Sequence, residues 1–148
     1  IHSTDEDYVQ ANESKRQEML DPNNKKRVVI VDDMRTNLQM LREILVPKYN
    51  VTLFKSGNQV LNYLKKDPKP DLIIMDIDMP EMLGTDCAEI INENYHHSIP
   101  ILFVSALSNL DIVLKCRELK AAGYIIRPYN SVYIQSEVER IIYHKGVF

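Results

Sequence analysis

The fold of this chain is decided by the run Arg27-Val28-Val29-Ile30-Val31-Asp32, in which β-branched residues follow one another without a polar interruption. Such a run is typical of a β-strand buried on both faces, because a strand with one solvated face alternates apolar and polar residues. Both faces of a sheet are buried when helices cover each of them. The run therefore predicts an α/β protein with a parallel sheet.

The rest of the chain alternates between strand and helix patterns. Further strands are predicted over residues 50–54, 71–76, 99–105 and 123–127, and amphipathic helices over 36–46, 57–66, 85–94, 109–120 and 132–144. Five strands that alternate with five helices form a parallel sheet covered on both faces. Right-handed crossover connections restrict its topology to a few arrangements.

Length and composition describe one ordinary domain. The chain has 148 residues, enough for a single hydrophobic core, and we expect residues 1–25 to be an N-terminal extension or linker helix ahead of a domain over 26–148. The net charge of -3 and the lack of a long apolar run give no reason to expect nucleic-acid binding or membrane insertion. Cys87 and Cys116 lack any CxxC or Cys/His pattern, which favours a reducing, cytoplasmic location over a disulfide or zinc site. We interpret the chain as a piece of a longer protein, with a stand-alone domain as the alternative.

Charged and hydroxyl side chains stand at the carboxyl ends of the predicted strands: Asp32 and Asp33, Asp76 with Asp78 close behind, Ser105, and Arg127. These ends meet at one edge of a parallel sheet, where such folds place their sites. Close carboxylates repel one another, and oxygen-only ligands favour Mg²⁺ as the ion that relieves the repulsion. A carboxylate can also be a nucleophile that forms an aspartyl phosphate. The charge of the phosphoryl group would then be met by the metal, the hydroxyl and the cation.

Four segments resemble, in order and spacing, the sequence signatures of response-regulator receiver domains. They cover residues 29–33, 72–84, 101–106 and 123–129, and the most specific is the Asp-x-x-Met-Pro-x-Met-x-Gly stretch that begins at Asp76. The resemblance extends over residues 26 to about 145. It implies a flavodoxin-like (βα)5 three-layer sandwich with strand order 2-1-3-4-5.

The resemblance also implies residue roles. Asp76 resembles the phosphoryl acceptor, with Mg²⁺ as cofactor and a histidine kinase or histidine phosphotransfer protein as donor. The implied metal ligands are Asp33 directly, Asp32 largely through water, Asp76, and the main-chain carbonyl of Asp78. Ser105 resembles the hydroxyl that binds the phosphoryl group, and Tyr124 the aromatic residue that changes rotamer with it.

The same resemblance implies a signalling module and not an enzyme, apart from phosphorylation and slow dephosphorylation of its own aspartate. The readout would lie on the helix over 109–120, the strand over 123–127 and the helix over 132–144. Association of two copies through this face is an alternative. The salt-bridged form of that dimer is in doubt, because the strand begins Ala121-Ala122-Gly123-Tyr124 without the usual Asp pair.

One residue departs from the family pattern: Arg127 stands where receivers usually have Lys, before a Pro128 that we expect to follow a cis peptide bond. Arg is planar and bidentate, whereas Lys is a compact point charge. Arg127 either clamps the phosphoryl group or pairs with Asp76 and occupies the pocket. The second case describes an atypical pseudo-receiver, a protein-interaction module that works without phosphorylation.

Two other readings carry less weight. Asp76-Ile77-Asp78 resembles the Asp-x-Asp motif of haloacid-dehalogenase-like phosphohydrolases, but that family places the motif on its first strand, whereas here it follows the third. His96-His97 is interpreted as a solvated loop and not as a metal site or phosphodonor, because no third ligand is near in sequence.

Overall fold

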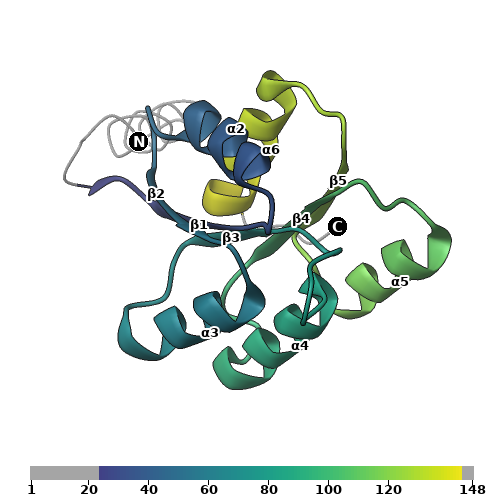
Figure 1. Ribbon diagram of the computed structural model, residues 1–148. Coiled ribbons are helices and arrows are strands. Elements are labelled where there is room, and N and C mark those ends of the chain that lie inside the picture. Colours follow the sequence, from purple (N-terminus) through teal and green to yellow (C-terminus); the bar gives the residue numbers. More distant parts are fainter. Residues whose placement is uncertain (1–23, 145–148) are drawn as a thin grey trace, which may run out of the picture.

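The computed structural model describes residues 24–144, so nearly all of the N-terminal extension expected over 1–25 lies outside the described residues. Five parallel strands form one sheet in the order β2-β1-β3-β4-β5, which confirms the flavodoxin-like topology (Figure 1). The strands are β1 (Arg27–Val31), β2 (Asn50–Phe54), β3 (Leu72–Met75), β4 (Ile101–Ser105) and β5 (Gly123–Ile126).

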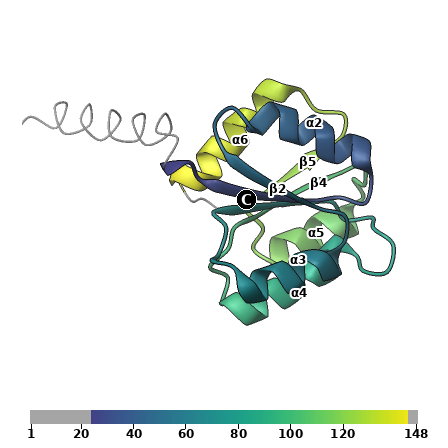
Figure 2. The same cartoon turned by 60° about the vertical axis from the view of Figure 1, so that its left-hand side comes forward.

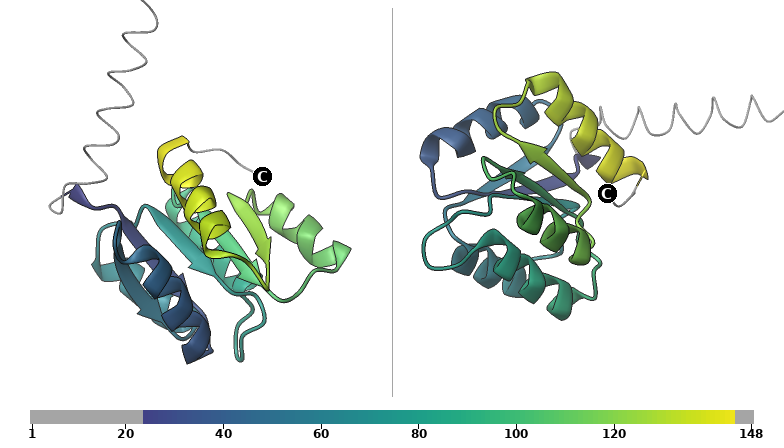
Figure 3. Two further views of the ribbon diagram at one scale, coloured as in Figure 1. Left: turned by 90° about the horizontal axis from the view of Figure 1, so that it is seen from above. Right: turned by 90° about the vertical axis from the view of Figure 1, so that its right-hand side faces the viewer.

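Helices cover both faces of this sheet, so the molecule has three layers (Figures 2 and 3). One face carries α2 (Arg35–Leu45) and α6 (Ser131–His144). The other face carries α3 (Gly57–Lys66), α4 (Gly84–Tyr95) and α5 (Leu110–Glu118). Each helix and strand lies within two residues of the range predicted for it: strand β4 begins at Ile101 and not at Ile99, and helix α5 ends at Glu118 and not at Lys120.

The uninterrupted apolar run of β1 is explained by the two cores. Val28 and Ile30 pack into the core beneath α2 and α6, whereas Val29 and Val31 pack into the core beneath α3, α4 and α5. Successive side chains of a strand point to opposite faces, so both sets must be apolar when both faces are covered.

Several local features agree with the sequence. Cys87 and Cys116 are buried thiols in the core under α4 and α5, and burial raises the pKa of Cys87 to about 12. His96 and His97 are exposed and left-handed at the end of α4, as expected of a solvated loop. Within residues 24–144, no helix is both long enough and apolar enough to cross a membrane.

Candidate functional site

The carboxyl edge of the sheet brings three aspartates together. Val31 of β1 pairs with Met75 of β3, and each is followed directly by an aspartate, so Asp32 and Asp76 lie side by side on neighbouring strands. The carboxylate oxygens of Asp32, Asp33 and Asp76 all lie within 4.8 Å of one another. Asp32 and Asp76 are buried, and Asp33 is the more exposed of the three.

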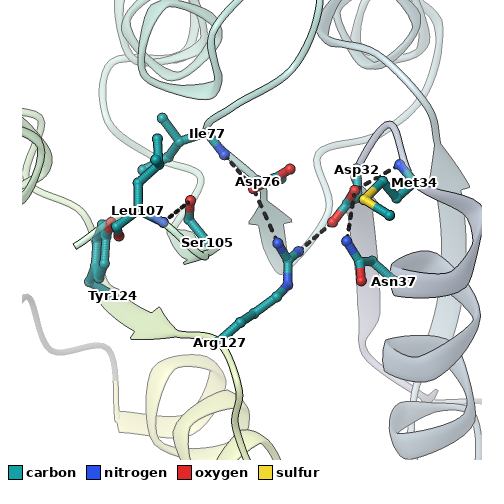
Figure 4. A network of polar contacts seen from close by, with 9 residues as sticks. All are labelled: Asp32, Met34, Asn37, Asp76, Ile77, Ser105, Leu107, Tyr124 and Arg127. Carbon is teal, nitrogen blue, oxygen red and sulfur yellow. Dashed lines mark hydrogen bonds and ion pairs between the residues drawn. The ribbon is translucent and has the colours of Figure 1, made fainter.

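Asp32 is held from two sides, as Figure 4 shows. Its Oδ1 accepts hydrogen bonds from the backbone N–H of Met34 at 2.9 Å and from Nδ2 of Asn37 at 3.4 Å. Its Oδ2 accepts a hydrogen bond from Nη2 of Arg127 and forms an ion pair with it. Both oxygens of this carboxylate are therefore engaged within the protein.

Asp76 is bound through one of its two oxygens. Oδ1 accepts the backbone N–H of Ile77 at 2.9 Å and lies 3.4 Å from Nη1 of Arg127. The first turn of α4 is pressed against this residue, because a Cβ added to Gly84 would lie only 1.9 Å from the main-chain oxygen of Asp76. This close approach of two backbone segments explains why the residue at position 84 is glycine, which the motif alone does not reveal.

Burial and crowding make the two inner carboxylates weaker acids. Burial, followed by the charge of Asp32, raises the pKa of Asp76 to about 6, although Arg127 acts in the opposite direction. Burial also raises the pKa of Asp32, against the hydrogen bond from Met34 and the charge of Arg127. Negative charge at this edge is therefore only partly compensated by the protein itself.

Arg127 follows the last residue of β5 and reaches across the edge to both inner carboxylates. The sequence left open whether Arg127 pairs with Asp76, and the structure shows that its guanidinium contacts Asp32 more closely than Asp76. The Arg127–Pro128 peptide bond is cis, as expected.

Ser105 and Tyr124, the two candidate switch residues, both bond to the backbone of Leu107. The fully buried Ser105 accepts the N–H of Leu107 through Oγ at 3.2 Å. The hydroxyl of Tyr124 donates to the main-chain carbonyl of Leu107 (Figure 4). Leu107 thus connects the end of β4 to β5.

This arrangement matches a known family. Residues 28–139 match the family model of the response regulator receiver domain. The chain belongs to the response-regulator receiver family of two-component signalling systems. The receiver assignment accounts for Asp76-Ile77-Asp78 without the haloacid-dehalogenase-like alternative.

Individual relatives agree with this assignment. The receiver is 35% identical over 122 residues to the transcriptional regulatory protein BaeR of Escherichia coli, a match that covers 80% of this chain and 49% of BaeR. It shares its fold with a CheY-like receiver domain protein of Methanospirillum hungatei, at a TM-score of 0.76 and 22% identity over 82% of this chain and 96% of the other. It is also similar to a chain of the CheX–CheY–BeF3–Mg²⁺ complex from Borrelia burgdorferi, at a TM-score of 0.72 and 26% identity over 78% and 88% of the two chains. The chain spans less than half of the length of curated relatives such as BaeR.

The receiver's loop after β3 separates Asp78 from the acidic cluster. The side chain of Asp78 is exposed, while Asp76 two residues earlier is buried. The exposure of this side chain is typical of a solvated loop acid. The role of its main-chain carbonyl as a metal ligand stays a prediction.

Sequence patterns missed two residues of the receiver's site. Asn37 donates to Asp32 from the first turn of α2, and the backbone of Leu107 donates to Ser105 and accepts from Tyr124. Asn37 carries a weak signal, since an amide near the start of a helix that follows an acidic pair is placed to meet that pair. Leu107 carries none, because only its backbone takes part.

The donor set of this receiver fits a hard divalent cation. Receiver domains generally bind Mg²⁺ at an acidic cluster, and Asp32, Asp33 and Asp76 supply carboxylate oxygens from two adjacent strands within 4.8 Å. The raised pKa of Asp76 gives an independent reason, because a second cation would relieve the charge that burial and Asp32 leave uncompensated.

Proposed function

We propose that this receiver accepts a phosphoryl group on Asp76 from the phosphohistidine of a histidine kinase or histidine phosphotransfer protein. The observation that carries the proposal is the position of Asp76: it lies within 4.8 Å of two further carboxylates, and its Oδ1 lies 3.4 Å from the Arg127 guanidinium. A buried carboxylate beside a cation and a metal-binding acidic pair is suited to act as a nucleophile toward phosphorus.

In the transfer step, a carboxylate oxygen of Asp76 forms a bond to phosphorus while the bond from phosphorus to the donor imidazole nitrogen breaks. The electron pair of that bond returns to the imidazole, and Asp76 becomes an acyl phosphate. Arg127 and Ser105 would donate hydrogen bonds to the phosphoryl oxygens. Mg²⁺, held by Asp32, Asp33, Asp76 and the Asp78 main-chain carbonyl, would neutralise the carboxylates and polarise the phosphoryl oxygens when bound.

Attack by water on the phosphorus would release inorganic phosphate and restore the carboxylate. The receiver would therefore turn over only its own phosphoryl group and would be no enzyme toward other substrates. Support for the metal and the phosphoryl group comes from the similar chain of the Borrelia complex, whose name includes BeF3 and Mg²⁺.

The proposed switch runs through Leu107. A phosphoryl group that draws the hydroxyl of Ser105 toward Asp76 would release the Leu107 N–H, and the Tyr124 hydroxyl would lose its present acceptor. The population would then shift toward a second arrangement of α5, β5 and α6. Exposed apolar side chains are already gathered on these elements, and they would contact an output partner or a second copy: Leu110, Leu114, Ile126, Val132 and Tyr133.

We also propose that this receiver is one domain of a longer protein. The match to BaeR covers only 49% of that protein, which supports a receiver that works beside further domains of a longer protein. We infer a domain over residues 26–148 with an N-terminal linker over 1–25, acting in the cytoplasm.

The experiment is labelling by acetyl phosphate with Mg²⁺, followed by intact-protein mass spectrometry. The parent should gain one phosphoryl group and Asp76→Asn should gain none, because the amide is not a nucleophile. Asp78→Asn is the matched control, since this neighbouring acid is exposed and should leave labelling possible. A parent that stays unlabelled, or an Asp76→Asn variant that is labelled equally, would contradict the proposal.

The alternative of a phosphorylation-independent interaction module is favoured by one observation, the contact of Arg127 with both inner carboxylates. This module would show no labelling in the parent at any Mg²⁺ concentration. Restored labelling in Arg127→Lys would show that the arginine alone prevents the reaction.

A further inference from the structure

The guanidinium of Arg127 contacts two carboxylates at once, those of Asp32 and Asp76. In the sheet order, β5 is separated from β1 by β4 and β3, so Arg127 extends across the edge past Asp76 to reach Asp32. Nη1 faces Asp76 and Nη2 contacts Asp32. A lysine would have to meet both carboxylates with a single nitrogen, whereas the planar fork of arginine offers a separate nitrogen to each.

The contact falls on a particular oxygen atom. Oδ1 of Asp32 already accepts from Met34 and Asn37, so Oδ2 is the oxygen that these two donors leave for a cation. Arg127 donates to that same Oδ2. The side chain of Asp32 is only 1% exposed, so solvent offers little room for an incoming ion to approach it from another direction.

We propose that Arg127 is a built-in competitor of the divalent cation for Oδ2 of Asp32, and that it weakens Mg²⁺ binding to this receiver. This inference rests on the metal site of the proposed function and concerns its regulation. A cation at the acidic cluster, bonded to Oδ2 directly or through a bound water, needs the lone pairs to which the guanidinium is already bonded, and the two positive charges repel each other. Binding of the ion therefore requires Arg127 to give up its contact with Asp32.

The released guanidinium has a second use. Once it leaves Asp32, Arg127 keeps its place beside Asp76, where its fork suits the oxygens of a phosphoryl group. Arg127 would thus close the site when the ion is absent and bind the phosphoryl group when the ion is present. A lysine would perform the second role without opposing the metal to the same degree.

The test is Mg²⁺ affinity measured by isothermal titration calorimetry on the parent and on Arg127→Lys, a substitution that keeps the charge. Loss of one charge-assisted hydrogen bond to Asp32 should lower the Mg²⁺ dissociation constant about tenfold in the variant. Lys65→Gln, which removes an exposed cation from the end of α3, is the control for total charge and should leave the constant close to that of the parent. An unchanged or higher dissociation constant in Arg127→Lys would overturn the inference.

A double-mutant cycle tests whether Arg127 and the cation compete at the carboxylate of Asp32. In an Asp32→Asn background, Arg127→Lys should change the Mg²⁺ dissociation constant less than twofold, because the shared carboxylate is gone. A persistent tenfold change there would also overturn the inference, since the competition would then lie elsewhere. Urea denaturation of every variant shows that the compared proteins are folded.

The outcomes separate this inference from the function on which it rests. If the parent and Arg127→Lys bind Mg²⁺ equally and both are labelled by acetyl phosphate, the competition is wrong and the receiver function stands. If neither binds Mg²⁺ or accepts a phosphoryl group, the metal site itself is wrong and the inference falls with it.

Discussion

At the amino edge of the sheet, Asp71 accepts the backbone N–H of Arg27 at 2.8 Å, and the Arg27 guanidinium donates to the main-chain carbonyl of Pro68 at 2.7 Å and to the hydroxyl of Tyr63. At the carboxyl edge, Arg127 faces two buried carboxylates that also repel each other. Both edges use aspartate and arginine. At the amino edge each polar group has a partner near solvent, whereas the carboxyl edge gathers more buried negative charge than one arginine compensates.

The difference shows how residue types acquire a function from their placement. An aspartate that accepts one backbone N–H beside solvent fastens two strands together. An aspartate buried beside another is stabilised by any cation or proton that arrives, because the folded protein holds it in a charged state that its surroundings disfavour. We therefore expect cations and protons to change the stability of the carboxyl edge more than that of the amino edge.

The largest expected effect is on the backbone packing of the carboxyl edge. Gly84→Ala should lower the free energy of unfolding by about 3–5 kcal/mol, because its Cβ would lie 1.9 Å from the main-chain oxygen of Asp76. Gly123→Ala is the matched change at the amino edge, where the new Cβ would meet the Cδ1 atom of Leu102 at 2.9 Å. A side chain can move aside, so this variant should lose less than about 1.5 kcal/mol in urea denaturation. Equal losses in the free energy of unfolding would show that the backbone contact at Gly84 is no more restrictive than the side-chain contact at Gly123.

The next largest effect is a loss of stability that Mg²⁺ reverses for a variant of Arg127 but not for a variant of Arg27. Arg127→Ala in EDTA should lower the free energy of unfolding by about 2–4 kcal/mol, because it leaves buried carboxylates without their cation. Adding Mg²⁺ should restore much of that loss, since a bound ion stabilises the folded state by mass action. Arg27→Ala should also destabilise, through its lost contacts with Pro68 and Tyr63, but by an amount that Mg²⁺ does not change. A loss in Arg127→Ala that is insensitive to Mg²⁺ would contradict the comparison.

The smallest expected effects are changes in stability when an aspartate is replaced by asparagine, and they have opposite signs at the two edges. The pKa of Asp76 is about 6 in the folded protein against an ordinary value of 3.8, so its charged form opposes folding above pH 6 and this penalty disappears as the pH falls below 3.8. Asp76→Asn in EDTA should therefore stabilise the protein by about 1–3 kcal/mol at pH 7.5 and by nearly nothing at pH 3.5. Asp71→Asn should instead destabilise by about 0.5–1 kcal/mol at pH 7.5, because it weakens the bond from Arg27. Urea denaturation at both pH values tests the signs, and a destabilising Asp76→Asn would refute this account of the acidic cluster.

Much of the fold was predictable because its elements are strongly patterned locally. The range of β2 was predicted as Asn50–Phe54 and that of α3 as Gly57–Lys66, and both agree with the structure. Strand β3 was predicted to include Asp76 but ends at Met75, although the backbone N–H of Asp76 still donates to the carbonyl of Val31 at 2.9 Å. A difference of one residue at a strand end is not resolved by an apolar pattern.

The alternation of strands and helices, and the acidic, hydroxyl and basic residues at the strand ends, are predictable from the sequence because apolar periodicity and chain order are local properties. The closer contact of Arg127 with Asp32 than with Asp76, and the shared contact of Ser105 and Tyr124 with Leu107, are visible only in the folded molecule. Those contacts join strands that are distant in the chain, and they depend on sheet order, side-chain reach and backbone groups that every residue shares.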